Sequence, residues 1–504
     1  MKQNLRRTAA FMLAMLTAAS LYACSGETKD SETDSPGISD APSVTPADDP
    51  SAVETAPETE ARVDGPEKTD LGGYELKIVT STWFNNDGII HPEELTGEVI
   101  NDAVYNANLG VAETYNCGFA PIILDTYPAV TQAVELAVKS GMDEYDLSYN
   151  HDNQTVANAM KGYFLNIRGS DVFNFDAPWW TKTAEDFTVG GGLYFTANYV
   201  TYSPLYFGLV LIYNKDIAAN YGIEIPYERI FNGEWYLEDL IAMTKGTNQD
   251  LDGDGQMTLG KDQYGFMASS LGLVNFQVSL GISVLGKDEE GYLSFSVDQE
   301  RLSKALDMME RLMENGLNKD NVPGEPWGYG SVHFANGQVL FNYPQIVDIP
   351  AQMHDTDVRF GTLPPPKLDE NQKDYISGCF DVYWAIPKTA YERVDTIATI
   401  VEGMGHNCYY DVLPAAYETT LQVRFSDSPN DARAFEIIRD SMCVDVGYAF
   451  NEWCPALSGI VRAFSTMTSG TMASEIAKNE TMLAKQLSKT NDRIRKMNEE
   501  WARP

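Results

Sequence analysis

The sequence has few cysteine and histidine residues, and it lacks the short motifs that mark many enzyme active sites. Its 504 residues include six cysteines and five histidines, and the histidines are scattered along the chain. No G-x-S-x-G, H-E-x-x-H, P-loop or G-x-G-x-x-G motif is present. The residues therefore give no support to a hydrolase with a nucleophile elbow, a zinc protease or a nucleotide-binding enzyme, and we expect no enzyme.

Basic residues are also scarce relative to acidic ones. The chain has 36 Lys and Arg against 73 Asp and Glu, which gives a formal net charge of −37. Nucleic acids and anionic membrane surfaces are bound through cationic protein surfaces. The composition thus argues against both as partners, and it places no limit on a neutral small ligand.

The one clear hydrophobic run lies at the N-terminus and is short. Lys2, Arg6 and Arg7 precede an apolar run over about residues 8–19, which falls below the roughly 20 apolar residues needed to span a bilayer. This pattern is typical of a signal peptide. The sequence Leu-Tyr-Ala-Cys at 21–24 follows, and it resembles a bacterial lipobox.

The lipobox resemblance implies that residues 1–23 are a lipoprotein signal peptide and that Cys24 carries lipid. The protein would then be anchored to the outer face of the cytoplasmic membrane, at the surface of a Gram-positive cell. The alternative is an ordinary secreted protein with a leftover cysteine. Five further cysteines remain at positions 117, 379, 408, 443 and 454, an odd number without zinc-binding spacing, so we expect buried free thiols and leave one disulfide open.

Residues 24–70 have the composition of a disordered tether. Between Ser25 and Asp70 there are 13 acidic residues, three basic residues and almost no large apolar side chains. Such a segment cannot bury enough surface to fold. We expect it to hold a folded body away from the membrane.

The folded part is predicted to begin near Leu71 with alternating strands and helices. Strands are expected at 74–80, 119–124 and 145–149, and helices at 101–115 and 129–140, the second ended by Gly141. This order predicts βαβ units and a largely parallel sheet. Ligands of such sheets bind at the carboxyl ends of the strands, so the loops after residues 80 and 149 are of most interest.

A second α/β body is predicted from about residue 206. The run 206–213 is almost entirely apolar, which is typical of a strand buried on both faces. Further strands are expected at 334–341 and 358–363. Helices are expected at 236–245, 299–315, 346–353 and 473–501.

The order of several short motifs resembles the bacterial extracellular solute-binding proteins of carbohydrate ABC transporters, the family 1 group that includes the maltose-binding protein. The motifs are 177–180 (APWW), 191–194 (GGLY), 211–216 (LIYNKD), 221–226 (YGIEIP), 233–240 (GEWYLEDL), 250–255 (DLDGDG), 262–265 (DQYG), 334–337 (FANG) and 360–367 (FGTLPPPK). Each motif alone is weak, and their joint order over some 200 residues carries the resemblance.

The resemblance implies an α/β fold of the two-lobed, class II periplasmic-binding-protein type with a hinge between the lobes. The first lobe would hold residues 71–204 plus 360–410, and the second lobe residues 205–359 plus 411–504. The implied function is capture of a small ligand, an oligosaccharide, and its delivery to the permease subunits of an ABC importer. Such a protein works as a monomer and requires no cofactor.

Sugar binding needs flat apolar surfaces for the C–H faces of the ring and planar polar groups for its hydroxyls. In the maltose-binding relative, a His-Asp pair follows the third strand and its carboxylate holds sugar hydroxyls. Asp152 after His151 is therefore the leading polar candidate. The full set of predicted ligand-binding residues is Trp83, Asp152, Trp179, Trp180, Phe276, Tyr343, Asp381 and Trp384. For each aromatic residue the plainer alternative is packing in the core.

An Asp-rich loop reproduces the first half of an EF-hand-type calcium loop. Asp250, Asp252 and Asp254 alternate with other residues, and Gln256 and Asp262 could add oxygen ligands. The twelfth position should be an acid but is Lys261. A structural calcium ion and a solvated acidic turn therefore both remain open.

Two other functions stay in view. A surface glycoside-active enzyme needs two facing carboxylates, which no pattern can exclude in so acidic a chain. An adhesin or scaffold lipoprotein would suit the anchor and tether equally well, although the α/β body is not the repeat architecture expected for it.

Overall fold

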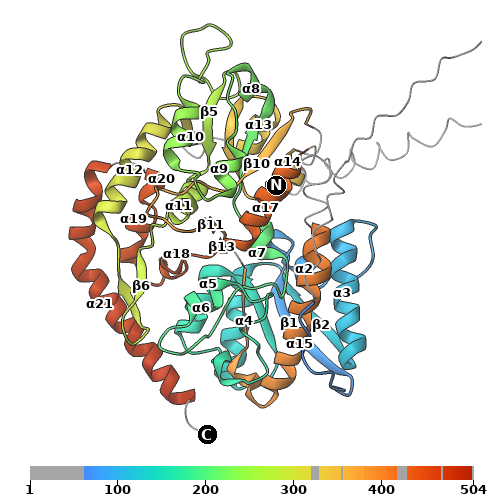
Figure 1. The fold of residues 1–504 in the computed structure, drawn as a ribbon. Helices are drawn as coiled ribbons and strands as arrows, with labels where there is room; N and C mark the ends of the chain where they lie inside the picture. Colours follow the sequence, from blue (N-terminus) through green and yellow to red (C-terminus); the bar gives the residue numbers. More distant parts are fainter. Residues whose placement is uncertain are drawn as a thin grey trace, which may run out of the picture. The chain divides into compact units, whose positions relative to one another are not determined.

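The computed structural model describes residues 62–318, 329–353, 356–380, 382–416, 428–466 and 469–501. Asp381 and the predicted signal peptide, with Cys24, lie outside these residues. Two β-sheets with helices around them organise the described part of the chain (Figure 1). Within that part, no helix is both long enough and apolar enough to cross a bilayer.

The first sheet has the strand order β12-β3-β1-β2. Its strands are β1 (Tyr74–Ser81), β2 (Cys117–Leu124), β3 (Leu147–His151) and β12 (Val382–Ala385). β1 is parallel to β2 and to β3, whereas β12 runs antiparallel to β3. The predicted alternation is confirmed, with α3 (Val99–Tyr115) and α4 (Tyr127–Ser140) as the connecting helices.

Local sequence accounts for the ends of α4. The Thr126 side chain accepts a hydrogen bond from the Ala129 N–H, and Pro128 occupies the first turn, where its missing N–H costs nothing. Gly141 ends the helix in the left-handed conformation with φ of 68°. The predicted stop at Gly141 is confirmed.

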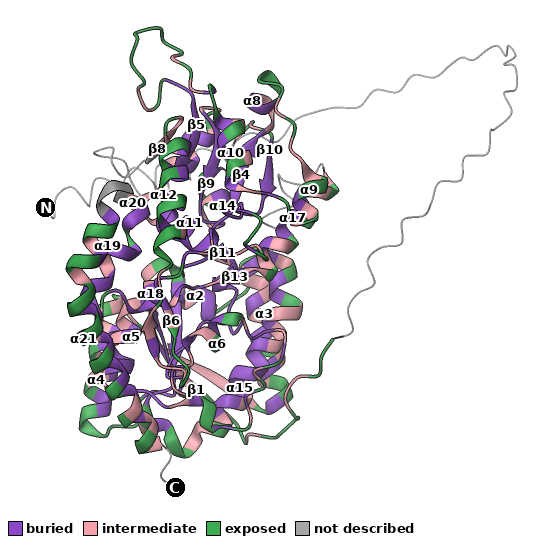
Figure 2. Ribbon diagram, turned by 60° about the vertical axis from the view of Figure 1, so that its left-hand side comes forward, coloured by how far each residue is buried: buried purple, intermediate pink, exposed green. Residues whose placement is uncertain are grey.

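The second sheet has the order β10-β4-β9-β5-β8 and is mixed. Its strands are β4 (Leu211–Asn214), β5 (Tyr264–Ala268), β8 (Gly316–Asn318), β9 (Val339–Tyr343) and β10 (Phe360–Leu363). β5 is parallel to β8 and β9, and β4 is antiparallel to β9 and β10. Apart from β2 and β8, most strand residues of the two sheets are buried, while the surrounding helices carry exposed faces (Figure 2).

The remaining elements surround the sheets and connect them. The elements up to residue 300 are η1 (Trp83–Asn85), α2 (Asn86–Ile90), α5 (Asp152–Met160), η2 (Ile167–Gly169), α6 (Lys182–Phe187), α7 (Ser203–Tyr206), α8 (Lys215–Asn220), α9 (Tyr227–Phe231), α10 (Leu237–Thr244), α11 (Ser270–Ser279), β6 (Leu285–Lys287) and β7 (Leu293–Phe295). Those that follow are α12 (Gln299–Met313), α13 (Tyr329–Ala335), α14 (Asp348–Gln352), β11 (Ser377–Gly378), η4 (Lys388–Arg393), α15 (Val394–Asn407), η5 (Cys408–Val412), α17 (Pro429–Asp440), β13 (Met442–Cys443), α18 (Val446–Phe450), η6 (Pro455–Leu457), α19 (Ser458–Val461), α20 (Ala463–Thr466) and α21 (Ser469–Trp501).

Two predicted strands are shorter than expected. The segment 334–341 contains the end of α13, a turn at Gly337 with φ of 72°, and only then the start of β9. The segment 206–213 forms a strand only from Leu211, because Pro204 starts the short helix α7 just before it. In both cases a helix end or turn takes residues that the apolar pattern alone had assigned to a strand.

Three chain segments cross between the two sheets and pair with one another. β11 and β13 are parallel partners, and Cys379 N–H donates to the Cys443 carbonyl at 3.0 Å. The third segment joins through the Leu209 N–H, which donates to the Gly378 carbonyl at 3.0 Å. We call the first sheet with α3, α4, α5, η4 and α15 the first lobe, and the second sheet with α8 to α14 the second lobe.

The predicted start of the return segment at residue 360 is wrong. β10 pairs with β4 in the second sheet, so residues 360–363 belong to the second lobe. The chain returns to the first lobe through β11 and joins its sheet at β12. The pairing of strands, which an apolar pattern does not specify, decides the boundary.

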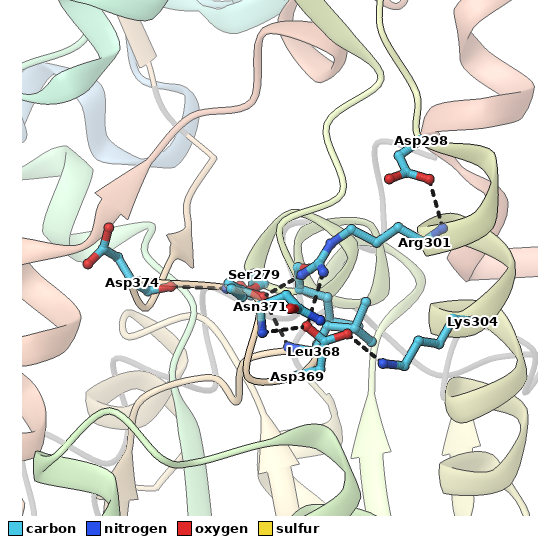
Figure 3. Close-up of polar contacts among 10 residues, drawn as sticks. Ser279, Asp298, Arg301, Lys304, Leu368, Asp369, Asn371 and Asp374 are labelled. Atoms are coloured by element: carbon cyan, nitrogen blue, oxygen red, sulfur yellow. Dashed lines mark hydrogen bonds and ion pairs between the residues drawn. The ribbon is translucent and has the colours of Figure 1, made fainter.

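A partly buried ion-pair network holds the loop before β11 on the second lobe (Figure 3). Arg301 and Lys304 of α12 pair with Asp369 at 3.2 and 2.5 Å. Burial alone would raise the pKa of Asp369, but the two cations lower it. Gln372 extends the network by accepting from Arg301 at 3.2 Å and donating to the Ser279 carbonyl at 2.9 Å.

A buried carboxylate in the first lobe has no such cation beside it among the residues that the structure describes. Glu402 of α15 accepts hydrogen bonds from the indole N–H groups of Trp179 at 2.8 Å and Trp180 at 2.7 Å. Burial raises the pKa of Glu402 to about 7, against the opposing effect of these donors. The folded protein therefore binds a proton here in a pH range where the unfolded chain has released it.

We predict that this proton makes the free energy of unfolding fall as pH rises from about 4.5 to 7, by on the order of 3 kcal/mol. The sign follows because a carboxyl group with a raised pKa favours the folded state at low pH and disfavours it once ionised. The Glu402→Gln variant lacks this contribution. Its amide N–H₂ cannot accept a hydrogen bond, so one indole N–H loses its acceptor, and this destabilises the fold at low pH by about 1–3 kcal/mol. Urea unfolding at pH 5 and 7.5 measures how the free energy of unfolding changes with pH in the wild type and in the variant.

Asp445, whose pKa burial raises to about 6, contributes to the slope in both proteins and so cancels in the comparison. Equal pH slopes in the wild type and in Glu402→Gln would contradict the prediction.

Candidate cavity between the lobes

A cavity of about 220 Å³ lies where the two lobes meet the crossing segments. Its lining residues are Trp83, Phe84, His151, Asp152, Phe207, Leu271, Gln345, Phe380, Val382 and Tyr448. The lining therefore comes from both lobes and from the segments that cross between them.

Parallel pairing of β1 and β3 explains the position of the first-lobe residues. The register pairs Ile78 with Leu147 and Val79 with Ser148, so the carboxyl ends of the two strands lie side by side. Trp83 follows β1 and Asp152 follows β3, as the sequence indicated. The Trp83 ring centroid lies 4.5 Å from that of His151.

The turn that carries Phe84 has an unusual backbone. Phe84 and Asn85 both adopt positive φ, at 50° and 60°. For residues other than glycine this left-handed conformation costs free energy and persists only where surrounding contacts impose it. The turn places the Phe84 ring, which is 47% exposed, beside Phe207 at a centroid distance of 6.1 Å.

Asp152 is the polar centre of the cavity. It lies in the first turn of α5, where the helix dipole stabilises a negative charge, and its Oδ1 is 2.6 Å from His151 Nδ1. Tyr448 faces it from α18. Burial raises the pKa of Tyr448 well above 10, and the Asp152 charge raises it further, so the hydroxyl remains a donor.

The cavity wall is mostly aromatic and carries little charge. Five of its ten lining residues are Trp, Phe or Tyr, and no Lys or Arg is among the ten. An anionic ligand would therefore find no cationic side chain in this lining. A neutral ligand with apolar faces would find several rings.

A smaller hollow adjoins the cavity and shares Gln345 and Phe380 with it. Its polar lining residues come from the second lobe and are Ser269, Ser331, Asn342, Tyr343, Gln345 and Asp348. Amides and hydroxyls of this kind can both donate and accept hydrogen bonds. The cavity thus offers aromatic rings, and the adjoining hollow offers hydroxyl, amide and carboxylate groups.

The structure brings Trp83 and Asp152 to the cavity and Tyr343 to the adjoining hollow, but it places four other candidates in the core. Trp179, Trp180, Trp384 and Phe276 are each at most 8% exposed. Trp179 and Trp180 donate to Glu402, and Trp384 donates to Asn198 at 2.8 Å. Their prediction as ligand contacts is corrected to core packing, because none of the four lines the cavity or the adjoining hollow. The three indoles are buried and hydrogen-bonded, and the Phe276 ring packs edge-on against Phe266 and Tyr343.

The sequence placed Phe84 beside Trp83 after the first strand, but sequence reasoning missed several other lining residues. Phe380 is a neighbour of the predicted Asp381, so its position held a partial signal. Asp381 itself lies outside the described residues. Tyr448 carried no signal, because it reaches the cavity from α18, almost 300 residues after Asp152.

The Asp-rich loop lies away from the cavity. Ligand oxygens of Asp250, Asp252 and Asp254 lie within 4.8 Å of one another. Lys261 Nζ is 3.0 Å from Asp252 and supplies a positive charge to the cluster. Asp262 is buried and closes the loop by accepting from the N–H groups of Leu251 at 2.8 Å and Thr258 at 2.6 Å.

Gln256, the remaining predicted ligand, donates its backbone N–H to the Asp254 carboxylate at 2.8 Å. Bound calcium stays a prediction. The loop geometry assigns Asp262 a clear structural role, and it shows that Lys261 competes with any cation for Asp252.

We predict that Lys261→Glu binds calcium more tightly than the wild type, because it removes the competing ammonium and supplies the missing acid at the twelfth position. The measurement is the calcium-dependent rise in melting temperature, reversed by a chelator. Asp252→Asn serves as the opposite control and should reduce any rise. An equal response in all three proteins would show that these residues hold no calcium.

No family model matches the chain, and no curated protein matches it. Solved structures do. A family 1 extracellular solute-binding protein from Bifidobacterium longum subsp. infantis aligns with a TM-score of 0.51 at 13% identity, over 82% of this chain and 100% of that one. The cyclic alpha-maltosyl-1,6-maltose binding protein from Arthrobacter globiformis aligns with a TM-score of 0.50 at 14% identity, over 82% of this chain and 99% of that one. At this identity the likeness concerns the fold, and the chain has the two-lobed fold of the family 1 extracellular solute-binding proteins.

Proposed function

We propose that this chain is an extracellular solute-binding protein that captures a small ligand between its lobes for an ABC importer. The observation that carries the proposal is the cavity itself, since it is lined from both lobes and lies at the carboxyl ends of β1 and β3. The fold supports the same function, because the aligned structures are binding proteins.

The ligand we propose is a neutral carbohydrate. Aromatic rings such as Trp83 and Phe84 provide surfaces for the C–H faces of a sugar, and Asp152 and Gln345 can bond its hydroxyls. The lack of Lys and Arg in the lining disfavours sugar acids and sugar phosphates. A glycosidase needs two carboxylates, and the described residues offer Asp152 in the cavity and Asp348 in the adjoining hollow, so the turnover measurement below decides the enzyme alternative.

We also propose that the protein is a lipoprotein held through Cys24 and an acidic tether. Arg62 and Pro66, near the end of the predicted tether, contact the folded body: Arg62 pairs with Asp411 of η5, and Tyr115 Oη of α3 donates to the Pro66 carbonyl at 3.0 Å. These contacts fix the point at which the tether leaves the folded body. A permease partner follows from the proposed function.

We predict that a soluble chain beginning at Ser25 shows a ligand-dependent rise in melting temperature with neutral oligosaccharides and no product formation. Matched sugar acids should give a smaller rise, because the cavity lining has no cationic side chain. The measurement is a thermal shift screen with chromatography of the mixtures. Turnover would support the enzyme alternative, and indifference to sugars, peptides and polyols would support a scaffold.

We further predict that Asp152→Asn weakens binding of the best neutral sugar by about ten- to a hundredfold, the usual effect of losing hydrogen bonds to a charged group. Isothermal titration measures the affinity. The matched control is Asp102→Asn, which removes a carboxylate from the first turn of α3, away from the cavity lining. Equal affinities in the two variants would remove Asp152 from the site.

A further inference from the structure

The C-terminal helix α21 contacts both lobes. It has 33 residues, which corresponds to a length of about 50 Å. The helix packs on α12 of the second lobe and follows one edge of the fold towards the first lobe (Figure 1). Ile476, Leu483 and Leu487 are buried, so a continuous apolar face holds it in place.

The C-terminal end of α21 is hydrogen-bonded to the first lobe. Tyr194 Oη donates to Asn498 Oδ1 at 2.5 Å, and Asn498 Nδ2 donates to the Gly190 carbonyl at 2.8 Å. Trp501 lies against Tyr391 of η4 with ring centroids 5.5 Å apart. The segment with Gly190 and Tyr194 belongs to the first lobe, because Thr196 next to it bonds to β12.

A hairpin from the second lobe reaches the same place. β6 and β7 lie between α11 and α12 in the chain, and the Gly291 carbonyl of their turn accepts from the Gly190 N–H at 2.9 Å. The Arg495 guanidinium of α21 lies 4.1 Å from the centre of the neighbouring Tyr292 ring. Asn491 joins helix and hairpin by bonding both backbone groups of Leu293, at 3.1 and 2.8 Å.

The glycine run 190–192 is what allows this close approach. A side chain at Gly190 would collide with the Tyr292 ring, and one at Gly192 would collide with Asn498 and Tyr194. Gly190 also has a φ of 54°. These glycines therefore admit the hairpin and α21 against the backbone of the first lobe.

We propose that α21 and the β6–β7 hairpin form a latch that fixes the angle between the lobes. Crossing strands alone leave two lobes free to rotate about the line of crossing. The latch ties the lobes at a second place, and α21, which packs on α12 and is bonded to the first lobe near its C-terminal end, cannot change its length. Rotation therefore requires the Asn498 and Gly291 contacts with Gly190 to break first, so opening and closing of the cavity are coupled to release of the latch.

Spin labels on the two lobes test this proposal in the free protein, without any ligand. A keto amino acid introduced at Leu136 on α4 and at Ala242 on α10 carries the labels, and both positions are exposed. Pulsed electron resonance then gives the distribution of interlobe distances. We expect one narrow distribution with the latch intact, and a broader one with a second distance in Asn498→Ala.

Gly192→Ala disrupts the contact with Asn498 from the side of the first lobe and should give the same broadening of the distance distribution. The test therefore does not depend on a single variant. Arg493→Ala is the control, since this residue lies exposed on α21 next to the latch residues. A narrow, unchanged distribution in both folded latch variants would overturn the proposal. A broad distribution already in the intact protein would overturn it as well.

Because these distances are measured without ligand, the outcome is separate from that of the sugar screen. A chain that binds no sugar can still show the latch, and a sugar-binding chain can fail to show it.

Discussion

Parallel pairing between β1 and β3 is the constraint on which the candidate site depends. It sets two carboxyl ends side by side and so brings Trp83 and Asp152, almost 70 residues apart in the chain, into one cavity. The crossing ladder of β11 and β13 then brings Phe380 and the segment leading to Tyr448 to the same place. Without both pairings the aromatic residues would be scattered over two unrelated surfaces.

Three acidic groups show how the neighbouring residues decide the role of a buried carboxylate. Asp369 is paired with two cations, and its pKa is lowered despite burial. Glu402 accepts from neutral donors, the two indoles and the Asn174 N–H, and burial raises its pKa to about 7. Asp152 lies at a helix N-terminus with His151 and Tyr448 beside it, and it also borders open space. Of the three, only Asp152 combines a defined orientation with room for a ligand.

Much of the fold could be predicted from the sequence because local signals specify it. The α4 helix, predicted from residue 129, follows the Thr126 side chain, which accepts from the Ala129 N–H, and it stops at Gly141, whose backbone adopts the left-handed conformation. The boundary of the returning segment could not be predicted, since β10 and β12 look alike as apolar runs and differ only in their partners. Strand pairing is a long-range property that periodicity does not contain.

The candidate site was harder to predict for a similar reason. An aromatic residue in a sequence shows how much apolar surface it has, but not whether that surface meets the core or a cavity. Trp179 and Trp180 were predicted to contact a sugar, but both indole N–H groups donate to Glu402 in the core. Asp152 was within reach of prediction because its place at a strand end restricts where its side chain can lie.

The glycine run 190–192 links the fold to the behaviour of the cavity. A cavity lined from two lobes changes its width whenever the lobes rotate, so its fit to a ligand depends on the interlobe angle as well as on Trp83 or Asp152. The backbone at Gly190 is the point where the first lobe meets both the hairpin and α21. With the lobes held by the proposed latch, substitutions at Gly190 would alter the width of the cavity without removing any residue of its lining.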